Sequence, residues 1–314
     1  MNTVRKFAIS IAMLGLSVAT QSFAQTFTYT QIDVPNASGT TPVGINSYGQ
    51  IVGISDDADG TSHGFLRDTD GTYLKLDYPG ASLTFANGIN DQGQIVGGWI
   101  DSKGYNRAFI RSPSGVFSNL DPPAPCFPSR DPLSVAIAHQ INNHGDIVGR
   151  CFSPNHHEYG WILHYDRTFQ ILTGSGLTAS DAWFAPIGSQ YIAGGESGAG
   201  THRSGEGIYY HVGSFHGVLW NRGGGFTTLD VNDSQTSLRS MNSSGDITGV
   251  YYDAALARFH GFLLRSGVVT NIDFPNSSDS NNTVINDSGV IAGGFNDAAG
   301  AEHGFIATCS GNGC

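Results

Sequence analysis

The side chains best suited to chemistry gather in one stretch of the chain, roughly residues 151–216. Imidazole, indole, phenol and guanidinium groups stand there outside any regular pattern: His156, His157, Trp183, His202, Arg203, Tyr209, Tyr210 and His211. Aromatic faces stack on ring-containing polar ligands, and imidazole or guanidinium groups fix their hydroxyls. The set predicts a ligand-binding surface suited to a glycan. Decorated loops without a ligand are the alternative.

Two other chemistries could use the same side chains. A polysaccharide lyase needs one His and one Tyr, as base and acid, converging on an acidic sugar. The negative net charge of the chain disfavours that substrate unless Arg203 neutralises it locally. A metal site would draw on His156, His157, His202 or His211, but their irregular spacing is more typical of loop histidines. We therefore predict a binding protein without a metal, assign no catalytic residue and keep a lyase as the alternative.

Motifs for other reactions are absent from the sequence. It contains no H-E-x-x-H and no phosphate-binding glycine-rich loop. The acidic clusters Asp56–Asp59 and Asp68–Asp70 lack the distal Glu of a calcium-binding EF-hand, so Asp-Gly turns explain them better. A weak surface calcium site is compatible with this composition, and we expect no other cofactor.

The elements that position these residues follow from an internal repeat. Ten-residue strings recur along the chain: GINSYGQIVG at Gly44, GINDQGQIVG at Gly88, QINNHGDIVG at Gln140, SMNSSGDITG at Ser240 and VINDSGVIAG at Val284, with a degenerate PIGSQYIAG at Pro186. A strand-like core follows each: HGFL at His63, RAFI at Arg107, YGWI at Tyr159, HGVL at His216, HGFL at His260 and HGFI at His303. A fixed period of this kind overrides local propensities in deciding the fold.

A third recurring piece alternates apolar and polar residues and usually ends in Asp. It reads YLKLD at Tyr73, VFSNLD at Val116, FTTLD at Phe226 and VTNID at Val269, with a looser FQIL at Phe169. Alternation indicates half-buried strands, and the Asn-x-x-Gly cores supply hairpin turns. Each repeat is thus a four-stranded antiparallel unit of about 44 residues, a length typical of propeller blades. We name its strands a, b, c and d in chain order.

Six repeats predict an all-β, six-bladed β-propeller over residues 25–314, with a β-sandwich as the alternative. FTYTQID, from Phe27 to Asp33, is a d strand that precedes any c strand, and HGFIA at His303 is a c strand with no d strand after it. Pairing the two would complete the last blade and close the ring without an open edge. The repeated Asn and His residues then belong to the scaffold, with Asn bonding its own turn and His satisfying neighbouring backbone groups.

Segments that depart from the repeat indicate the position of a binding site better than the repeat itself does. Residues 122–134 enlarge one d–a loop, and residues 195–215 enlarge the b–c loop of the fourth repeat. In a propeller these loops emerge on the same face, as does the loop that carries His156 and His157. The candidate binding residues should therefore share one face of the third and fourth blades.

The strings G-I-N-x-x-G-x-I-V-G and H-G-F-L or R-A-F-I resemble the HAF family of probable extracellular repeat proteins over nearly all of the chain after residue 24. The name-giving His-Ala-Phe is mostly His-Gly-Phe here, with Arg107-Ala108-Phe109 the nearest match to the Ala. The resemblance implies bacterial export and a propeller-like fold. It implies no activity for any residue.

Export is also indicated by the amino terminus. Arg5 and Lys6 precede an apolar run from Phe7 to Val18, and Ser22-Phe23-Ala24 forms a small-residue boundary, as in a secretory signal peptide over residues 1–24. Its removal changes the formal charge from −11 to −13, which disfavours nucleic acid and anionic membranes as partners. We expect a secreted or periplasmic monomer, not inserted in a membrane, that binds an extracellular glycan or protein.

Four cysteines fit an oxidising compartment. Cys126 and Cys151 flank strand a of the third repeat, and Cys309 and Cys314 lie at the carboxyl end. Two disulfides, 126–151 and 309–314, are the predicted pairing, because any other would have to cross the disc.

Overall fold

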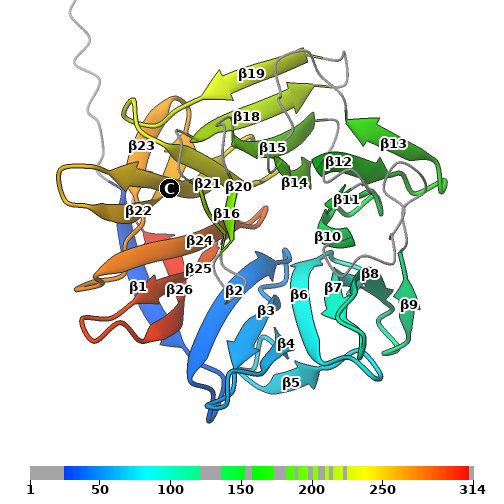
Figure 1. Ribbon diagram of the computed structural model, residues 1–314. Helices are drawn as coiled ribbons and strands as arrows, with labels where there is room; N and C mark the ends of the chain where they lie inside the picture. The colour runs from blue at the N-terminus through cyan, green and yellow to red at the C-terminus, as the bar shows by residue number, and fades with distance from the viewer. Residues whose placement is uncertain are drawn as a thin grey trace, which may run out of the picture.

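The computed structural model describes residues 25–120, 136–152, 158–172, 182–187, 190–196, 201–203, 209–211, 215–221 and 225–310. All regular structure in these ranges is β-strand, and none of them contains a helix that could cross a membrane. Figure 1 shows the strands as sheets arranged in a ring around a central axis.

The first two repeats form two four-stranded antiparallel sheets. One contains β2 (Gly39–Ile45), β3 (Ile51–Asp56), β4 (Ser62–Arg67) and β5 (Tyr73–Leu76). The next contains β6 (Leu83–Ile89), β7 (Ile95–Ile100), β8 (Asn106–Arg111) and β9 (Phe117–Asn119). Strand order equals chain order in both, as expected for propeller blades.

The central part of the chain repeats this plan. The third sheet contains β10 (Ala136–Ile141), β11 (Ile147–Phe152), β12 (Glu158–Leu163) and β13 (Phe169–Leu172). Strands β14 (Ala182–Ile187), β15 (Gln190–Glu196), β18 (Phe215–Asn221) and β19 (Gly225–Leu229) pair next in that order. Between β15 and β18, β16 (Thr201–Arg203) and β17 (Tyr209–His211) form a separate hairpin.

The remaining sheets complete the ring. One contains β20 (Thr236–Met241), β21 (Ile247–Asp253), β22 (Arg258–Arg265) and β23 (Val268–Asn271). The closing blade contains β24 (Asp279–Ile285), β25 (Ile291–Asn296), β26 (Glu302–Ser310) and β1 (Thr26–Ile32). β1 pairs antiparallel with β26 over its whole length, from Thr26 opposite Ser310 to Ile32 opposite Gly304. The predicted closure by the N-terminal strand is confirmed.

The core explains why Ile-Val-Gly and His-Gly-Phe recur together. In the second blade, Gly97 of β7 lies opposite the fully buried Phe109 of β8. A Cβ at Gly97 would stand 1.9 Å from the Phe85 carbonyl oxygen and 2.9 Å from the Phe109 ring. Four other blades pair a strand b glycine with a buried strand c aromatic in the same way: Gly53 with Phe65, Gly149 with Trp161, Gly249 with Phe262 and Gly293 with Phe305.

Aromatic stacking also joins neighbouring blades. Tyr78, which follows β5, stacks on Trp99 of β7 with ring centroids 4.0 Å apart. Phe274, which follows β23, stacks on Phe295 of β25 at 4.1 Å. The residue after the strand d Asp thus packs against strand b of the next blade, which adds buried aromatic contact at the blade interface.

Each strand a with described side chains also contains an irregularity that the sequence does not predict. The pairing register with strand b shifts by one residue, which is the mark of a β-bulge. The extra residue lies between Pro42 and Gly44, Ala86 and Gly88, Ala138 and Gln140, Leu238 and Ser240, or Asn281 and Thr283. Those residues are Val43, Asn87, His139, Arg239 and Asn282, so the bulge carries a different side chain in most blades.

Candidate functional site

The repeated strand c histidines bind carboxylates rather than the backbone groups that the sequence predicts. Nδ1 of His63 lies 2.8 Å from Asp77 Oδ1, and Nδ1 of His216 lies 2.7 Å from Asp230 Oδ2. The Asp in each pair is the one that ends strand d. Because strands c and d are antiparallel neighbours, Gly64 opposite Leu76 brings His63 beside Asp77.

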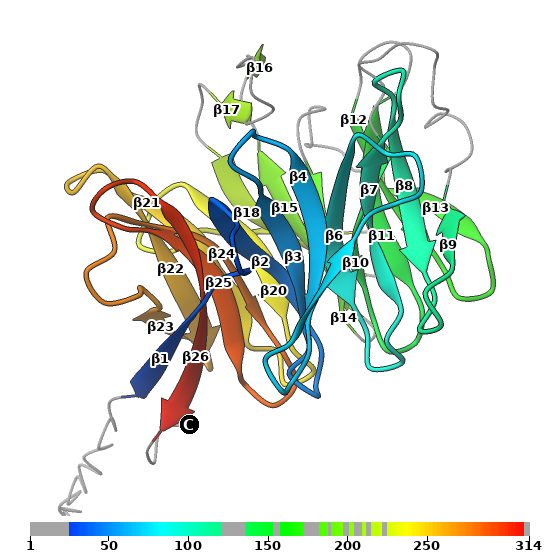
Figure 2. The ribbon, with the colours of Figure 1, turned by 90° about the horizontal axis from the view of Figure 1, so that it is seen from below.

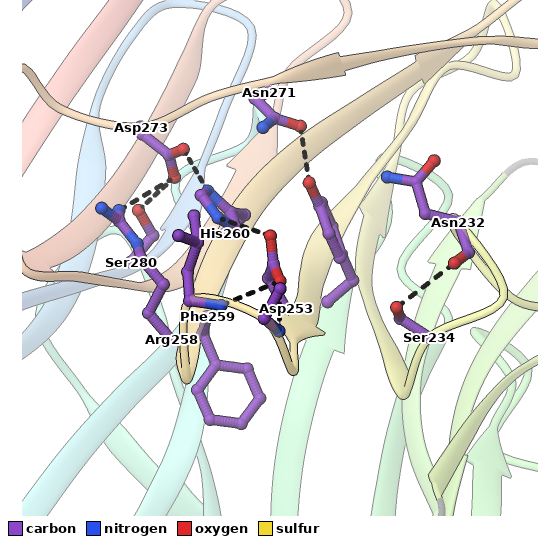
Figure 3. A network of polar contacts seen from close by, with 12 residues as sticks. Asn232, Ser234, Asp253, Arg258, Phe259, His260, Asn271, Asp273 and Ser280 are labelled. Atoms are coloured by element: carbon purple, nitrogen blue, oxygen red, sulfur yellow. Dashed lines mark hydrogen bonds and ion pairs between the residues drawn. The ribbon is translucent and has the colours of Figure 1, made fainter.

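In three blades a second carboxylate approaches the other ring nitrogen. Nε2 of His260 lies 3.8 Å from Asp253, whereas Nδ1 lies 2.5 Å from Asp273, as Figure 3 shows. The corresponding groups are Asp57 and Asp77 around His63, and Asp297 and Asp33 around His303. We call these three arrangements the Asp–His–Asp triplets.

The triplets make the repeated histidines part of the scaffold. Asp273 also accepts hydrogen bonds from the Gly261 amide and from Ser280 Oγ of the next blade, at 3.1 and 2.6 Å. Each imidazole is placed between two carboxylates that come from different loops, so its nitrogens face protein and not a shared ligand. No group of three or more His, Cys, Asp or Glu side chains that could hold a metal ion occurs among the described residues.

The repeated asparagines link the blades as well as their own turns. Asn46 Oδ1 accepts a 2.9 Å hydrogen bond from the Gln50 amide, which confirms the predicted turn role. Its Nδ2 donates to the Asn90 carbonyl of the next blade at 3.3 Å. Asn90 to Asn142, Asn242 to Asn286 and Asn286 to Asn46 repeat this bond at 3.2, 3.4 and 2.8 Å. We call the set the asparagine ring.

The acidic clusters of the first blade act as turn residues. The Thr61 amide donates to Asp59 at 3.0 Å, and both the amide and the hydroxyl of Thr72 donate to Asp70 at 2.9 and 2.7 Å. Hydrogen bonds from Thr61 and Thr72 hold the pKa of each carboxyl below its ordinary value. Asp-Gly turn geometry therefore accounts for both clusters, and the weak surface calcium site stays a prediction.

Five of the predicted binding residues lie on one small element. His202 and Arg203 belong to β16, and Tyr209, Tyr210 and His211 belong to β17. Their backbones pair with His202 opposite Tyr210 and Arg203 opposite Tyr209. Sequence reasoning placed these residues in a loop and did not predict the hairpin.

The hairpin stands apart from the blades. Figure 2 shows β16 and β17 projecting from one face of the disc, beyond the ends of the blade strands. Trp183 lies on β14, opposite Gly194 near the end of β15 that precedes the hairpin insertion. His156 and His157 lie outside the described residues, and whether they join the same surface stays a prediction.

The cysteines are consistent with an oxidised protein. Neither Cys151 nor Cys309 is a free thiol. Cys151 is fully buried within β11, opposite Ala136 and Tyr159, rather than at the start of the following loop as predicted. Cys126 and Cys314 lie outside the described residues, so the pairing stays a prediction.

Four-stranded antiparallel blades around an axis, with the N-terminal strand completing the last blade, define a β-propeller. No protein-family model matches the chain, and no curated protein sequence does. Solved propellers are similar in fold. AofleA from Arthrobotrys oligospora has 10% identity and a TM-score of 0.54, with 90% of this chain and 86% of that chain covered.

Two further structures represent a lectin and a lyase. Aleuria aurantia lectin AAL, solved with Fucα1-6GlcNAc, has 9% identity and a TM-score of 0.51 over 90% of this chain and 97% of that chain. A catalytically inactive virginiamycin B lyase from Staphylococcus aureus, solved with quinupristin, has 10% identity and a TM-score of 0.51 over 90% and 99%. At this identity the likeness establishes the fold alone.

Proposed function

We propose that this protein is an exported, non-enzymatic binding module of the HAF type. In this proposal it is a closed ring of six blades, the sheet of β14, β15, β18 and β19 being the fourth, and it binds a glycan through the β16–β17 hairpin. The ligand is extracellular, and the protein acts as a monomer.

One observation carries the proposal: the repeated polar side chains are occupied by the scaffold, whereas the hairpin lies outside the repeat. The Asp–His–Asp triplets, the His216–Asp230 pair and the asparagine ring account for the repeated His and Asn residues. The hairpin is an insertion between β15 and β18 that no blade needs. Its sequence combines two tyrosines, two histidines and an arginine, the side-chain types that stack on sugars and bond their hydroxyls.

The solved propellers support the proposal only as examples of what a protein of this fold can bind. The structure of Aleuria aurantia lectin with Fucα1-6GlcNAc shows a propeller holding a glycan. No specific contact is carried from that lectin to this chain.

A glycan array probed with residues 25–314 tests the proposal. We expect a small set of glycans to bind, and we expect Tyr209→Ala and Arg203→Ala to weaken binding at least about tenfold, as loss of an aromatic or arginine anchor does. Tyr48→Ala is the matched control. Tyr48 is 69% exposed and lies in the turn between β2 and β3, on the face opposite the hairpin.

Three results would overturn the proposal. The first is an array on which no glycan binds above background, and the second is equal binding by the Tyr209 and Tyr48 variants. The third is release of unsaturated uronate from an acidic polysaccharide, measured by its ultraviolet absorbance, which would make the protein a lyase.

A further inference from the structure

The face that carries the hairpin is acidic. The b–c and d–a loops lie at the same end of the blade strands, and the β16–β17 hairpin is itself an insertion in a b–c loop (Figure 2). Both carboxylates of each Asp–His–Asp triplet belong to this face, because one comes from the end of strand b or the loop after it and the other follows strand d. We call these carboxylates the acidic rim: Asp33, Asp57, Asp77, Asp253, Asp273 and Asp297.

The acidic rim faces water although it also binds the scaffold histidines. The side chains of Asp57 and Asp77 are each 49% exposed, and those of Asp297 and Asp33 are 40% and 39% exposed. A carboxylate at such a position still acts on charged molecules that approach the face, within about one Debye length of roughly 10 Å at 0.1 M salt.

Two cations lie beside the acidic rim without balancing it. Nζ of Lys75 is 3.7 Å from Asp57, and a guanidinium nitrogen of Arg258 is 3.9 Å from Asp273. Each triplet holds two carboxylates around one imidazole, so it is negative whether or not the imidazole carries a proton. The rim therefore keeps a negative charge after both cations are counted.

The opposite face, formed by the a–b and c–d turns, has a different balance. Arg67, Arg111 and Arg265 are the last residues of β4, β8 and β22, and all three strands end at this face. Arg265 pairs at 2.9 Å with Asp246, whose side chain is 10% exposed. Among the described residues this face also has fewer carboxylates than the hairpin face. The negative potential of the protein is therefore strongest on the side of the hairpin.

We propose that the hairpin binds a glycan that bears free amino groups, an inference that rests on the proposed function. Protonated amines are attracted by a potential of this sign, whereas uronates and sulfated sugars are repelled. Cations also bind to the faces of tyrosine rings, and β17 supplies Tyr209 and Tyr210. Arg203 is the single Arg or Lys of the two hairpin strands, so the hairpin does not reverse the charge of the rim.

The test is an array of glucosamine and galactosamine oligosaccharides, each in a free-amine form and an N-acetylated form of equal length, with oligogalacturonates beside them. At about pH 6 the sugar amines are largely protonated and ordinary carboxylates are ionised. We expect at least one free-amine member to bind at least about tenfold more tightly than its N-acetylated counterpart at low salt. The ratio should fall as sodium chloride is raised, because salt screens exposed charges.

Charge variants locate the effect. The double variant Asp57→Asn with Asp297→Asn keeps the shapes of two rim side chains and should reduce the free-amine preference at least about threefold. The control is Asp70→Asn with Asp166→Asn, which removes the same charge from exposed c–d turns of the opposite face and should leave the preference unchanged. If the rim variant does not fold, the salt dependence of the wild-type ratio decides.

The proposal fails if N-acetylated or uronate members bind as tightly as the free amines, if salt leaves the ratio unchanged, or if the two double variants behave alike. A neutral or acidic glycan whose binding is weakened by Tyr209→Ala would overturn this inference and leave the proposed function standing. Free-amine binding that Tyr209→Ala does not weaken would overturn both, because the ligand would then not be held by the hairpin.

Discussion

The side-chain amide of Asn286 donates a 2.8 Å hydrogen bond to the main-chain carbonyl of Asn46, across the junction between the closing blade and the first blade. Residues 240 positions apart are joined by the same bond that links Asn46 to Asn90 within consecutive repeats. The junction between the last blade and the first is therefore built like the other described junctions.

Asn286→Ala should lower the free energy of unfolding by about 2 kcal/mol, because it removes a buried inter-blade donor and leaves the Asn46 carbonyl and the turn amides of Ser288 and Val290 without their partner. Urea denaturation measures this change. Ser288→Ala is the control, since its hydroxyl makes only an exposed 3.5 Å contact with Ser47. Equal stability of the two variants would show that the asparagine ring contributes nothing.

Removing residues 25–33, which include β1, should lower Tm sharply, because β26 would lose its outer partner from Gly304 to Ser310 and expose an open sheet edge. Differential scanning calorimetry of residues 34–314 against residues 25–314 measures the loss. A Tm within a degree or two of the longer chain would mean that this strand does not hold the ring closed.

Gly97→Ala should destabilise the second blade by about 3 kcal/mol or more, because the added methyl group would overlap the Phe85 carbonyl oxygen. Gly104→Ala is the matched control. Gly104 has a φ of +83° but no atom within 4 Å of the new Cβ, so only backbone strain of about 1–2 kcal/mol is expected. Chemical denaturation compares the two, and a larger loss at Gly104 would contradict the packing explanation.

Loss of a strand c histidine should cost more stability where the imidazole is more buried, because hydrogen bonds to carboxylates strengthen away from water. The side chain of His260 is 9% exposed and that of His303 is 25% exposed. We expect His260→Ala to lower the urea midpoint more than His303→Ala, with glycan binding unchanged in both. The reverse order, or loss of binding, would assign these histidines a role beyond the scaffold.

Tyr29 should make stability depend on alkaline pH. Burial, and then the negative charge of Asp273, raise its pKa from 10.0 to about 12 in the folded chain. The neutral phenol is favoured on folding, so this contribution is complete below pH 10 and is lost as the pH rises from 10 towards 12. Tyr29→Phe should flatten that fall in urea denaturation, whereas Tyr48→Phe, at an exposed position, should leave it unchanged. Parallel pH profiles for wild type and Tyr29→Phe would refute the assignment.

Local sequence patterns predict the strands and their closure because the repeat carries them. The alternation in FTYTQID marks β1 as a d strand, and no other strand remains to pair with β26. Contacts between segments that are far apart in the sequence are harder to predict. His303 and Asp33 stand 270 residues apart, and their ion pair follows only from the register that ring closure imposes.

For the candidate site too, the sequence predicts local features better than contacts between segments. Its residue types on β16 and β17 are recognisable because they break the repeat, but their pairing into a hairpin is not, since three-residue strands carry almost no periodic signal. A pocket lined by Arg239, His139 and residues of other blades is harder still to predict. No sequence pattern around Arg239 or His139 indicates a bulge. A pocket on the propeller axis forms only where the strands of separate blades bring such residues together.

Pairing of Thr26 with Ser310 places both ends of the described chain side by side, and Figure 2 shows them on the face of the disc opposite the β16–β17 hairpin. The hairpin and the two chain ends therefore have a fixed orientation relative to each other, on opposite faces of the protein. A tether at either end, whether a fusion partner, an affinity tag or a solid support, would hold every molecule with the hairpin pointing away from the point of attachment. The same adjacency means that a linker of a few residues could join the two ends and allow the chain to be opened at an exposed turn elsewhere.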